Sequence, residues 1–523
     1  MASTTLAVLA AAADDIPFRA RTSYSHSTWA KTFSSFPELY IQPESVPEVQ
    51  KIIRLAACAR RRIVAAGSAH SPSDLTCTSS WLVNLDNLNK IVSVDHETGV
   101  VKAEAGIRLY ELSEELDKNG LALASLGSIN EQSVAGVIST GTHGSSLRHG
   151  LMSDMITSLK IALADGTVRS CSKLEEPDLF RAALLSLGAL GIIVEVTVQA
   201  VPSFALAWSQ TIDTDVDMLS RWPSSLWTTD EFVRVWWFPY TRRAVVWSAS
   251  KTYEPQYDPP TSYYDGTLGY YVYHNLLLLA QAVPRILPWV EWFVFGMQYG
   301  FENPSTITGC QPSRKALLMN CLYKQYVNEW AIPLAKGPEA LLRLGSWLNQ
   351  LKPGDPQYVE HGIPFSARGL WVHAPVEVRA SYTGTRDSGE NRPFLDPSVR
   401  DGPTLYLNAT LYRPYLYDPP CKERYYEAFE WLMRDLGGKP HWAKNFETTG
   451  EEIGQLFRRD DARDEGLGRW RTIRNDVDPK GMFVGPWHRR TVLDGPPLDL
   501  EEVEVAREKG PQGGLLVIGT VSG

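Results

Sequence analysis

A histidine follows a short apolar run in a polar, glycine-supported loop. Residues 63–66 (Ile-Val-Ala-Ala) predict the end of a buried strand, and Gly67-Ser68 predicts a tight turn ahead of His70. The Ser-Pro-Ser-Asp run at 71–74 is typical of ordered loop rather than helix. An imidazole in such a loop can react or bind a ligand, although a lone loop histidine is more often structural. The role of His70 therefore depends on the rest of the chain.

A second dense stretch runs from residue 127 to residue 146 and combines four glycines with seven hydroxyl side chains. Glycines let backbone N–H groups approach an anion, and Ser and Thr add donors without bulk, which suits a pyrophosphate. The stretch is not the dinucleotide fingerprint, because no Gly-x-Gly-x-x-Gly opens a helix after a strand. By itself it also fits an ordinary Gly/Ser-rich loop.

Two charged pairs of residues stand in the second half of the chain. Glu377 and Arg379 are two residues apart in Val-Glu-Val-Arg, so on a strand both side chains point to one face. A surface ion pair is the ordinary alternative for such a spacing. His441 and Lys444 belong to a His-Trp-Ala-Lys run that adds a second cation, and a packed loop is the alternative there.

Length and composition exclude several classes of protein. A chain of 523 residues predicts two or three domains. The net charge of −9 argues against nucleic-acid binding, which needs a basic face. The six cysteines are scattered without a Cys-x-x-Cys pair, so we expect free thiols, no disulfide framework and no metal site.

The first part of the chain mixes helices and strands. A capping box at Ser45-Val46-Pro47-Glu48 predicts a helix through residue 60, and Gly120 predicts the end of a helix over 109–119. Strands are expected at 81–85, 91–94, 100–105 and 192–198, a hairpin at 159–171, and a helix at 177–187. Aromatic strands such as 232–237 and 244–247 then predict a second domain.

These patterns predict five segments. A helix over 421–436, ended by Gly437-Gly438, is expected to lead the chain back to the first domain. The segments are a flexible leader (1–30), a first domain (31–202), a second domain with helical insertions (203–420), a C-terminal segment (421–493) and a tail (494–523).

The only long apolar region, residues 270–295, fails as a simple membrane span. It is interrupted by His274, Pro284, Arg285, Pro288 and Glu291. The region fits either a pair of buried core helices, which we favour, or an amphipathic surface that lies on a membrane.

Several motifs taken together resemble the aldonolactone oxidases of the vanillyl-alcohol-oxidase flavoprotein family, from about residue 33 to about residue 492. They are GSAHSPSDL at 67, GSINEQSVAGVISTGTHGSS at 127, FVRVWWFPYTR at 232, EWAIP at 329, VEVR at 376, LYRPY at 411 and HWAK at 441. The resemblance implies an α+β fold: a two-lobed FAD-binding domain of the vanillyl-alcohol-oxidase type plus a cap domain built on an antiparallel sheet. It also implies that the C-terminal segment 421–493 completes the FAD-binding domain and the active site.

The resemblance also implies the cofactor site. His70 would carry FAD covalently through its ring nitrogen on the 8α-methyl group, and a cysteinyl link is not expected, because the glycine-rich stretch has no cysteine. His143 stays open between ligand contact and loop packing. The implied cofactor-binding residues are Gly67, Ser68, His70, Ser71, Ser128, Ser133, Gly136, Ser139, Thr140, Gly141, Thr142, Gly144, Ile192, Ile193 and His441.

The implied reaction removes hydrogen from the C2 carbinol of a 1,4-lactone and passes it to flavin. Glu377 would bind the substrate hydroxyl or act as base, and Arg379 would stabilise charge near the flavin pyrimidine. Lys444 is the second expected cation. Related lactone dehydrogenases have Ala at the position of Gly127, so a glycine there predicts an oxidase that uses dioxygen and produces hydrogen peroxide.

Several alternatives remain at this point. Within the family, the substrate could be L-gulono- or L-galactono-1,4-lactone. From other classes, an aromatic-rich carbohydrate-binding module would leave the spacing of His70, the stretch 127–144 and HWAK unexplained. The FAD subunit of a molybdenum hydroxylase would lack the covalent histidine and the Glu377 and Arg379 pair. Relatives of this kind are often associated with the mitochondrial outer membrane, with 270–295 as the candidate contact; a cytoplasmic location is the alternative.

Overall fold

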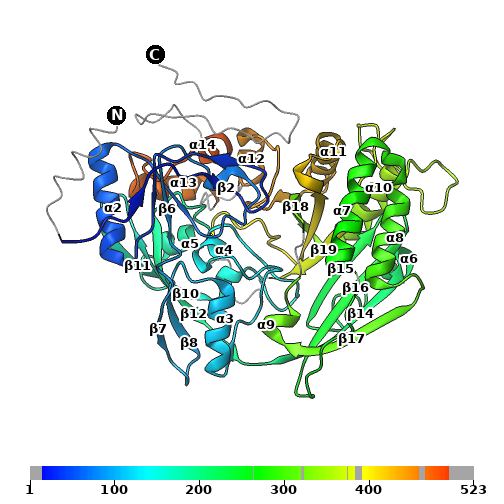
Figure 1. Cartoon of the computed structure of the whole chain (residues 1–523), viewed down its shortest axis with the longest axis horizontal. Helices are drawn as coiled ribbons and strands as arrows, with labels where there is room; N and C mark the ends of the chain where they lie inside the picture. Colours follow the sequence, from blue (N-terminus) through cyan, green and yellow to red (C-terminus); the bar gives the residue numbers. More distant parts are fainter. Residues whose placement is uncertain are drawn as a thin grey trace, which may run out of the picture.

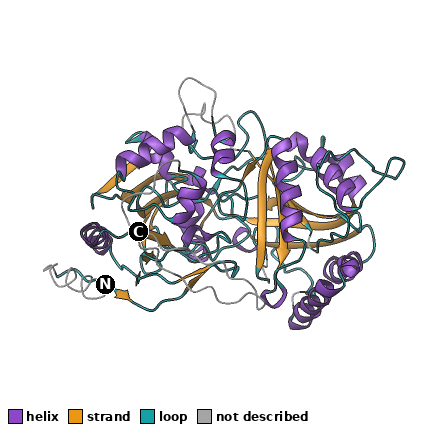
Figure 2. Ribbon diagram, turned by 90° about the horizontal axis from the view of Figure 1, so that it is seen from above, coloured by secondary structure: helices purple, strands orange, loops and turns teal. Residues whose placement is uncertain are grey.

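The computed structural model describes residues 15–262, 264, 266–319, 323–373, 375–382, 392–458 and 466–493. Two lobes lie side by side, a blue-to-cyan lobe from the N-terminal part and a green-to-yellow lobe from the middle of the chain (Figure 1). Each lobe contains sheet and helices, and Figure 2 shows helices on the outside of the sheets in both. The predicted α+β class is confirmed.

A small sheet with mixed strand directions carries the His70 loop. Its strand order is β1-β4-β6-β5, with β4, β6 and β5 parallel. Helix α2 begins as the capping box predicts, because the Ser45 hydroxyl accepts a hydrogen bond from the backbone N–H of Glu48. The elements are β1 (Ala20–Arg21), β4 (Leu39–Ile41), α2 (Val46–Ala59), β5 (Ile63–Ala66) and β6 (Trp81–Asn84).

A five-stranded antiparallel sheet forms the other half of this lobe, in the order β11-β10-β12-β8-β7. Its strands lie where the alternation predicts them, and its members are β7 (Ile91–Val94), β8 (Val100–Glu104), β10 (Ile156–Ala162), β11 (Val168–Ser172) and β12 (Ile192–Gln199). The accompanying helices are α3 (Leu109–Lys118), α4 (Val134–Ser139) and α5 (Pro177–Ala183). Helix α5 ends earlier than the predicted residue 187, because the chain turns through Leu187 and Gly188, both at positive φ.

The second lobe is built on one large antiparallel sheet in the order β17-β14-β16-β15-β19-β20-β18-β21. The predicted aromatic strands are β15 and β16. The strands are β14 (Ala205–Thr214), β15 (Phe232–Phe238), β16 (Arg243–Thr252), β17 (Ser305–Pro312), β18 (Gln325–Pro333), β19 (Val376–Ser381), β20 (Thr404–Tyr412) and β21 (Lys439–Pro440). Helices α6 (Asp215–Arg221), α9 (Ser313–Ala316) and α10 (Gly337–Leu348) accompany them.

Helix α11 (Lys422–Asp435) packs on this sheet rather than on the first lobe. Its Phe429 and Leu432 share a buried cluster with Leu344 of α10 and Leu407 of β20. The expectation that this helix leads the chain back to the first domain therefore needs correction. The return comes after β21, and α12 (Gly450–Leu456), α13 (Leu467–Val477) and α14 (Pro486–Thr491) lie beside the blue lobe (Figure 1).

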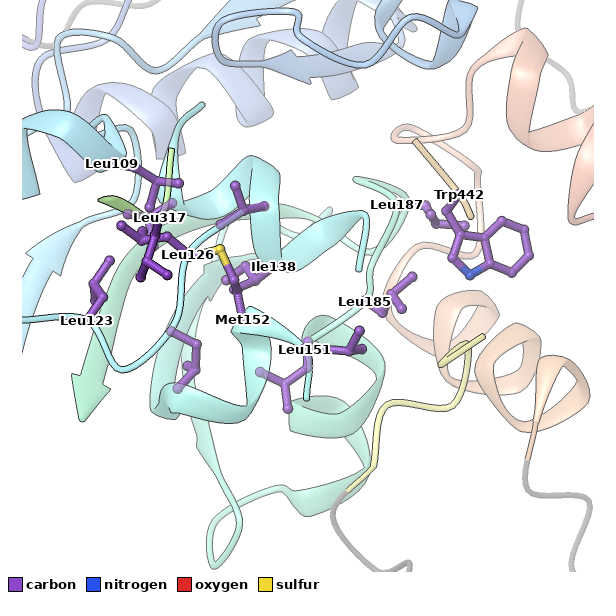
Figure 3. Packing of buried hydrophobic residues seen from close by; sticks show 14 of the residues in the cluster. Leu109, Leu123, Leu126, Ile138, Leu151, Met152, Leu185, Leu187, Leu317 and Trp442 are labelled. Atoms are coloured by element: carbon purple, nitrogen blue, oxygen red, sulfur yellow. The ribbon is translucent and has the colours of Figure 1, made fainter. Parts of the chain in front are cut away.

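The lobes share a hydrophobic core with the C-terminal segment. Leu109 and Ile138 of the first lobe, Leu317 of the second and Trp442 of the return segment belong to one cluster of buried residues, and Figure 3 shows these four spread across it. Trp442 is fully buried and its indole N–H donates to the Leu395 carbonyl at 2.7 Å. This packing fixes the loop 441–445 between the lobes.

The apolar region 270–295 forms a helical hairpin, α7 (Thr267–Ala282) and α8 (Leu287–Tyr299). One side is buried through residues such as Tyr273 and Val294, whereas Leu279, Trp289 and Trp292 are 54%, 50% and 43% exposed. The hairpin thus has a buried face, as expected of core helices, and an exposed apolar face; its contact with a membrane stays a prediction. Within the described residues, no helix has the length and apolar character needed to cross a membrane.

Both chain ends extend beyond the described part. Residues 494–523, the expected tail, lie outside it, as do residues 1–14 of the expected leader. Residues 15–30 are ordered: Ala20 pairs with Ile41, and His26 pairs with Ser35, so ordered chain begins before residue 31. The remaining short strands are β2 (His26–Ser27), β3 (Ser34–Ser35), β9 (Leu121–Ala122) and β13 (Val201–Pro202). The five cysteines of the described part are free thiols.

Candidate active site

Two clefts meet at His70. The first runs through the N-terminal lobe, between the turn after β5 and helix α4, and reaches Gly188 and His488. The second lies between the two lobes and is bounded by the antiparallel sheet, with Glu377, Arg379 and Lys444 in its wall. His70, Ser71 and Gln132 line both. The loop that the sequence singled out is therefore the junction between them.

The backbone and its neighbours hold the His70 ring in place. Ala69 is in the left-handed region at φ +54°, and its carbonyl accepts from the Trp29 backbone N–H at 2.8 Å. The Trp29 indole stacks on the imidazole at 5.1 Å between centroids. Burial, followed by the charge of Arg108, lowers the pKa of His70 to about 4. The ring is neutral at pH 7, so one nitrogen lone pair is available for bonding.

Helix α4 approaches the β5 turn so closely that only glycine fits at position 67. A Cβ there would lie 2.3 Å from the Ser133 hydroxyl oxygen. That hydroxyl caps α4 by accepting from the Gly136 N–H at 3.3 Å. The stretch 128–144, expected as one loop, thus contains a short helix, because Ser133 supplies a cap and Val134, Val137 and Ile138 supply a buried face.

Most expected cofactor residues lie in one of the two clefts. The first cleft contains Gly67, Ser68, His70, Ser71, Ser133, Gly136, Ser139, Thr140 and Ile193. The second contains His70, Ser71, Gly127, Ser128, Thr142 and His441. Gly141, Gly144 and Ile192 line neither cleft. Ile192 packs in the core with Ala162 and Val194, and Gly141 turns the chain after α4 at φ +75°.

The residues present fit FAD. The Nδ1 atom of His70 is buried and has no hydrogen-bond partner, as a point of attachment requires. Hydroxyls from Ser68, Ser139 and Thr140 and the glycine at 67 line the first cleft, which gives it donors without bulk. Phe483 and His488 also line it, and sequence reasoning missed both because the C-terminal segment carries no glycine-rich motif.

Glu377 and Arg379 share one face of β19, as their spacing predicts, and both line the second cleft. Arg379 is 5% exposed, and its Nη1 donates to the Ser128 hydroxyl at 3.3 Å. The Glu377 carboxylate accepts from the Asn408 side-chain amide at 3.3 Å. The pair is therefore no surface ion pair; it connects the sheet to the glycine-rich stretch.

A third acidic residue, Glu329 on β18, holds the two expected cations. Arg379 Nη2 donates to Glu329 Oε1 at 2.5 Å, and Lys444 Nζ lies 3.3 Å from Oε2. Burial alone would raise the pKa of Glu329, but Arg379 and Lys444 hold it well below its usual range. Sequence reasoning missed this residue as a site residue, although it begins the EWAIP motif.

Arg234 on β15 is the other missed residue. Its register partner is Arg379, and its Nε lies 3.6 Å from Glu377 Oε1. Burial lowers the pKa of Arg234 to about 10, which leaves the guanidinium charged at pH 7. The charges thus alternate from Arg234 through Glu377, Arg379 and Glu329 to Lys444, and Glu377, Arg379 and Lys444 line the second cleft.

Comparisons with known proteins match nearly the whole chain. The model of the D-arabinono-1,4-lactone oxidase family matches residues 196–491, and that of an FAD binding domain matches residues 37–172. A Neurospora crassa relative is 62% identical, with 96% of this chain and 93% of the relative covered. This chain belongs to the D-arabinono-1,4-lactone oxidase family.

Relatives in the family include proteins named D-arabinono-1,4-lactone oxidase from two yeasts. The one from Yarrowia lipolytica is 41% identical over 89% of this chain and 96% of its own length. The one from Saccharomyces cerevisiae is 37% identical over 90% of this chain and 96% of its own length. The similarity predicted from the motifs is confirmed.

Solved structures match the fold. Cholesterol oxidase from Brevibacterium sterolicum matches with a TM-score of 0.74 at 16% identity, covering 92% of this chain and 99% of that one. A chitooligosaccharide oxidase matches with a TM-score of 0.64 at 13% identity, covering 95% and 99%. At these identities the likeness shows the fold alone. Together with the family model of an FAD binding domain, it confirms the predicted FAD-binding domain beside a domain on a large antiparallel sheet.

One cluster in the described residues has the geometry of a metal site. Potential ligand atoms of His143, Glu329 and His441 lie within 4.8 Å of one another. However, Arg379 and Lys444 already contact the only carboxylate of that cluster. A metal dication would add positive charge beside two cations, so an ion-pair network is the better description of these residues.

Proposed function

We propose that this protein is an FAD-dependent oxidase of aldono-1,4-lactones, with D-arabinono-1,4-lactone as the preferred substrate. The observation that supports the proposal best is the meeting of the glycine- and hydroxyl-lined cleft and the charged cleft at His70. Bound FAD supplies the acceptor for the two electrons of the C2 carbinol. The carbinol loses two electrons and two protons to become a 2-keto lactone, which tautomerises to the enediol. Dioxygen takes up the two electrons and two protons and becomes hydrogen peroxide.

Glu377, Arg379 and Lys444 would act on the substrate. The Glu377 carboxylate is 13% exposed and lines the cleft, so it can accept the hydrogen of the C2 hydroxyl. Arg379 and Lys444 place positive charge where oxygen atoms of the substrate become negative. Asn408, hydrogen-bonded to Glu377, keeps the carboxylate in one orientation.

His70 would hold the cofactor covalently. The neutral imidazole and the unpartnered Nδ1 support attachment through this ring. Acid denaturation of the purified protein tests the proposal: yellow fluorescence should stay with the unchanged polypeptide and be released from His70→Ala. Flavin released from both proteins would refute the covalent link and leave the proposed oxidase activity standing. A colourless protein would refute the proposal that it is a flavoenzyme.

Substrate preference needs a separate comparison. Turnover of D-arabinono-, L-gulono- and L-galactono-1,4-lactone by the same flavinylated preparation should be highest per mole of enzyme for the first. A higher kcat/KM for either of the other two lactones would show that D-arabinono-1,4-lactone is not the preferred substrate, and the proposed reaction type would be unchanged.

The exposed face of the α7–α8 hairpin supports a peripheral membrane contact, and we place that contact at the mitochondrial outer membrane. Leu279, Trp289 and Trp292 supply the apolar and aromatic side chains that enter a lipid interface. Trp289→Glu/Trp292→Glu should abolish co-sedimentation with phospholipid vesicles. Tyr253→Glu, at a fully exposed aromatic residue outside the hairpin, is the control. Equal sedimentation of both variants would contradict this contact, and cell fractionation tests the location.

A further inference from the structure

A fully buried carboxylate connects two cations that come from different parts of the chain. Glu329 is 0% exposed, near the middle of β18. Its Oε1 accepts from Arg379 of β19, and its Oε2 faces Lys444, which follows β21 in the return segment. One side chain therefore contacts a cation from the antiparallel sheet and a cation from the segment that leads back to the N-terminal lobe.

The backbone around Glu329 holds the return segment in register with β18. The His441 N–H donates to the Glu329 carbonyl at 2.9 Å, and the Asn445 N–H donates to the Val327 carbonyl at 2.7 Å. The loop that carries Lys444 is thus hydrogen-bonded to β18 on both sides of the contact. The carboxylate and the ammonium meet because of this register, not through a chance surface approach.

The Glu329 carboxylate pairs with the two cations and does not face the second cleft itself. Of the described residues, it is the only acidic side chain within 4 Å of Lys444 Nζ. Burial and the neighbouring Arg379 lower the pKa of His143, so the imidazole that faces Oε1 at 3.3 Å is neutral. The carboxylate lies behind Arg379 and Lys444 and does not line the second cleft, whereas both cations do.

We propose that Glu329 is a positioning residue that fixes the Arg379 guanidinium and the Lys444 ammonium at the substrate end of the second cleft. The inference rests on the roles proposed above for these two cations. Without the carboxylate, Arg379 keeps Glu377, at 3.7 Å, as its one acidic partner among the described residues. Lys444 would be free to move away, so charge stabilisation would weaken although neither cation is changed.

Glu329→Gln removes the charge and keeps the shape. We expect a kcat for lactone oxidation at least about 100-fold lower, in the range found when one electrostatic stabiliser is lost. In the Arg379→Ala/Lys444→Met background, where both cations are gone, the same substitution should cost less than about threefold, because residues that act as a unit are not additive. Independent, multiplicative losses would overturn the inference. If Glu329→Gln does not fold, Glu329→Asp carries the same cycle with the same two outcomes.

Chemical rescue gives a readout that a purely structural role would not move. In Arg379→Ala, added guanidinium should restore turnover saturably, since Glu329 can bind it where the side chain was removed. In Arg379→Ala/Glu329→Gln no rescue is expected. Equal rescue in both variants would show that Glu329 does not hold the cation.

Thermal unfolding provides a readout that does not depend on activity. Glu329→Gln should unfold at a lower temperature than Glu329→Gln/Arg379→Met/Lys444→Met, because only the first keeps both cations after their shared carboxylate is gone, with Arg379 left to Glu377 alone. The reverse order would count against the pairing. If Arg379→Ala and Lys444→Met instead keep full activity, the proposed roles of the cations fail, which is a different result from an additive Glu329 cycle.

Discussion

Gly127→Ala tests whether the space beside the glycine admits dioxygen. The backbone at Gly127 is not in the left-handed region, so alanine can adopt it. The added Cβ would lie 2.9 Å from the Thr142 methyl carbon and 3.7 Å from the His143 carbonyl oxygen. Carbon atoms in contact are normally about 3.5–4.0 Å apart, so the methyl group must move by at least about 0.6 Å.

The cost to folding is small. Overpacking costs typically about 1–3 kcal/mol. Replacing glycine by alanine recovers about 0.4–1 kcal/mol from the unfolded chain. The net loss of about 1 kcal/mol corresponds to a Tm lower by about 1 °C for a chain of 523 residues, so the variant should fold and carry flavin.

The expected effect is on the reaction with dioxygen. Gly127 and Thr142 both line the second cleft, so the new methyl group narrows it. We expect the anaerobically reduced variant to be reoxidised at least about tenfold more slowly in stopped flow, an added barrier of about 1.4 kcal/mol. Its reduction by lactone should change less. Reoxidation as fast as in the unchanged protein would refute the reasoning.

Gly127→Ala/Thr142→Ser is the matched control, because serine lacks the methyl group that the new Cβ meets. If the Cβ itself blocks dioxygen, the double variant stays slow. If it recovers fast reoxidation, the displaced threonine and not the alanine is the cause, and the predicted role of Gly127 is wrong.

Two further predictions concern buried carboxylates. Glu377→Gln removes the carboxylate between Arg234 and Arg379 and with it the proposed proton acceptor. Flavin reduction in anaerobic single turnover should therefore slow at least about 100-fold. An unchanged reduction rate would exclude Glu377 as base. Burial raises the pKa of Glu291 in α8 from 4.5 to about 7, so its stabilising protonated form is fully present below pH 4.5 and is lost as the pH rises through 7. Between pH 5 and pH 8 the free energy of unfolding of Glu291→Gln should therefore rise relative to that of the unchanged protein, by up to about 3 kcal/mol. Parallel curves of Tm against pH for the two proteins would contradict the burial of a titrating group.

Local sequence signals were sufficient for most elements of the first lobe. The capping box at Ser45 and the glycine at 120 predicted the ends of α2 and α3 within a residue or two, because these signals act through local hydrogen bonds. Tertiary packing decided the rest. Helix α4 lies inside a stretch whose composition is typical of loop. With six residues it is too short to be stable by itself, and the packing of its buried face stabilises it. The amphipathic pattern of α11 predicted the helix but could not say which lobe its apolar face contacts.

The same limit explains which site residues sequence reasoning found. Glu377 and Arg379 are neighbours on one strand, so their spacing alone placed them on one face. Arg234 and Glu329 are far away in the chain, and only the strand order β15-β19-β20-β18 brings them to that pair. A signal was nevertheless present: each is a charged residue inside a strand whose other residues are mostly apolar or aromatic. Burying one such charge without a partner is costly, so two of opposite sign in separate apolar strands indicate that each has a partner elsewhere. Apolar strands with single charges therefore predict a buried charge network, but the identity of the partners depends on the order of the strands in the sheet.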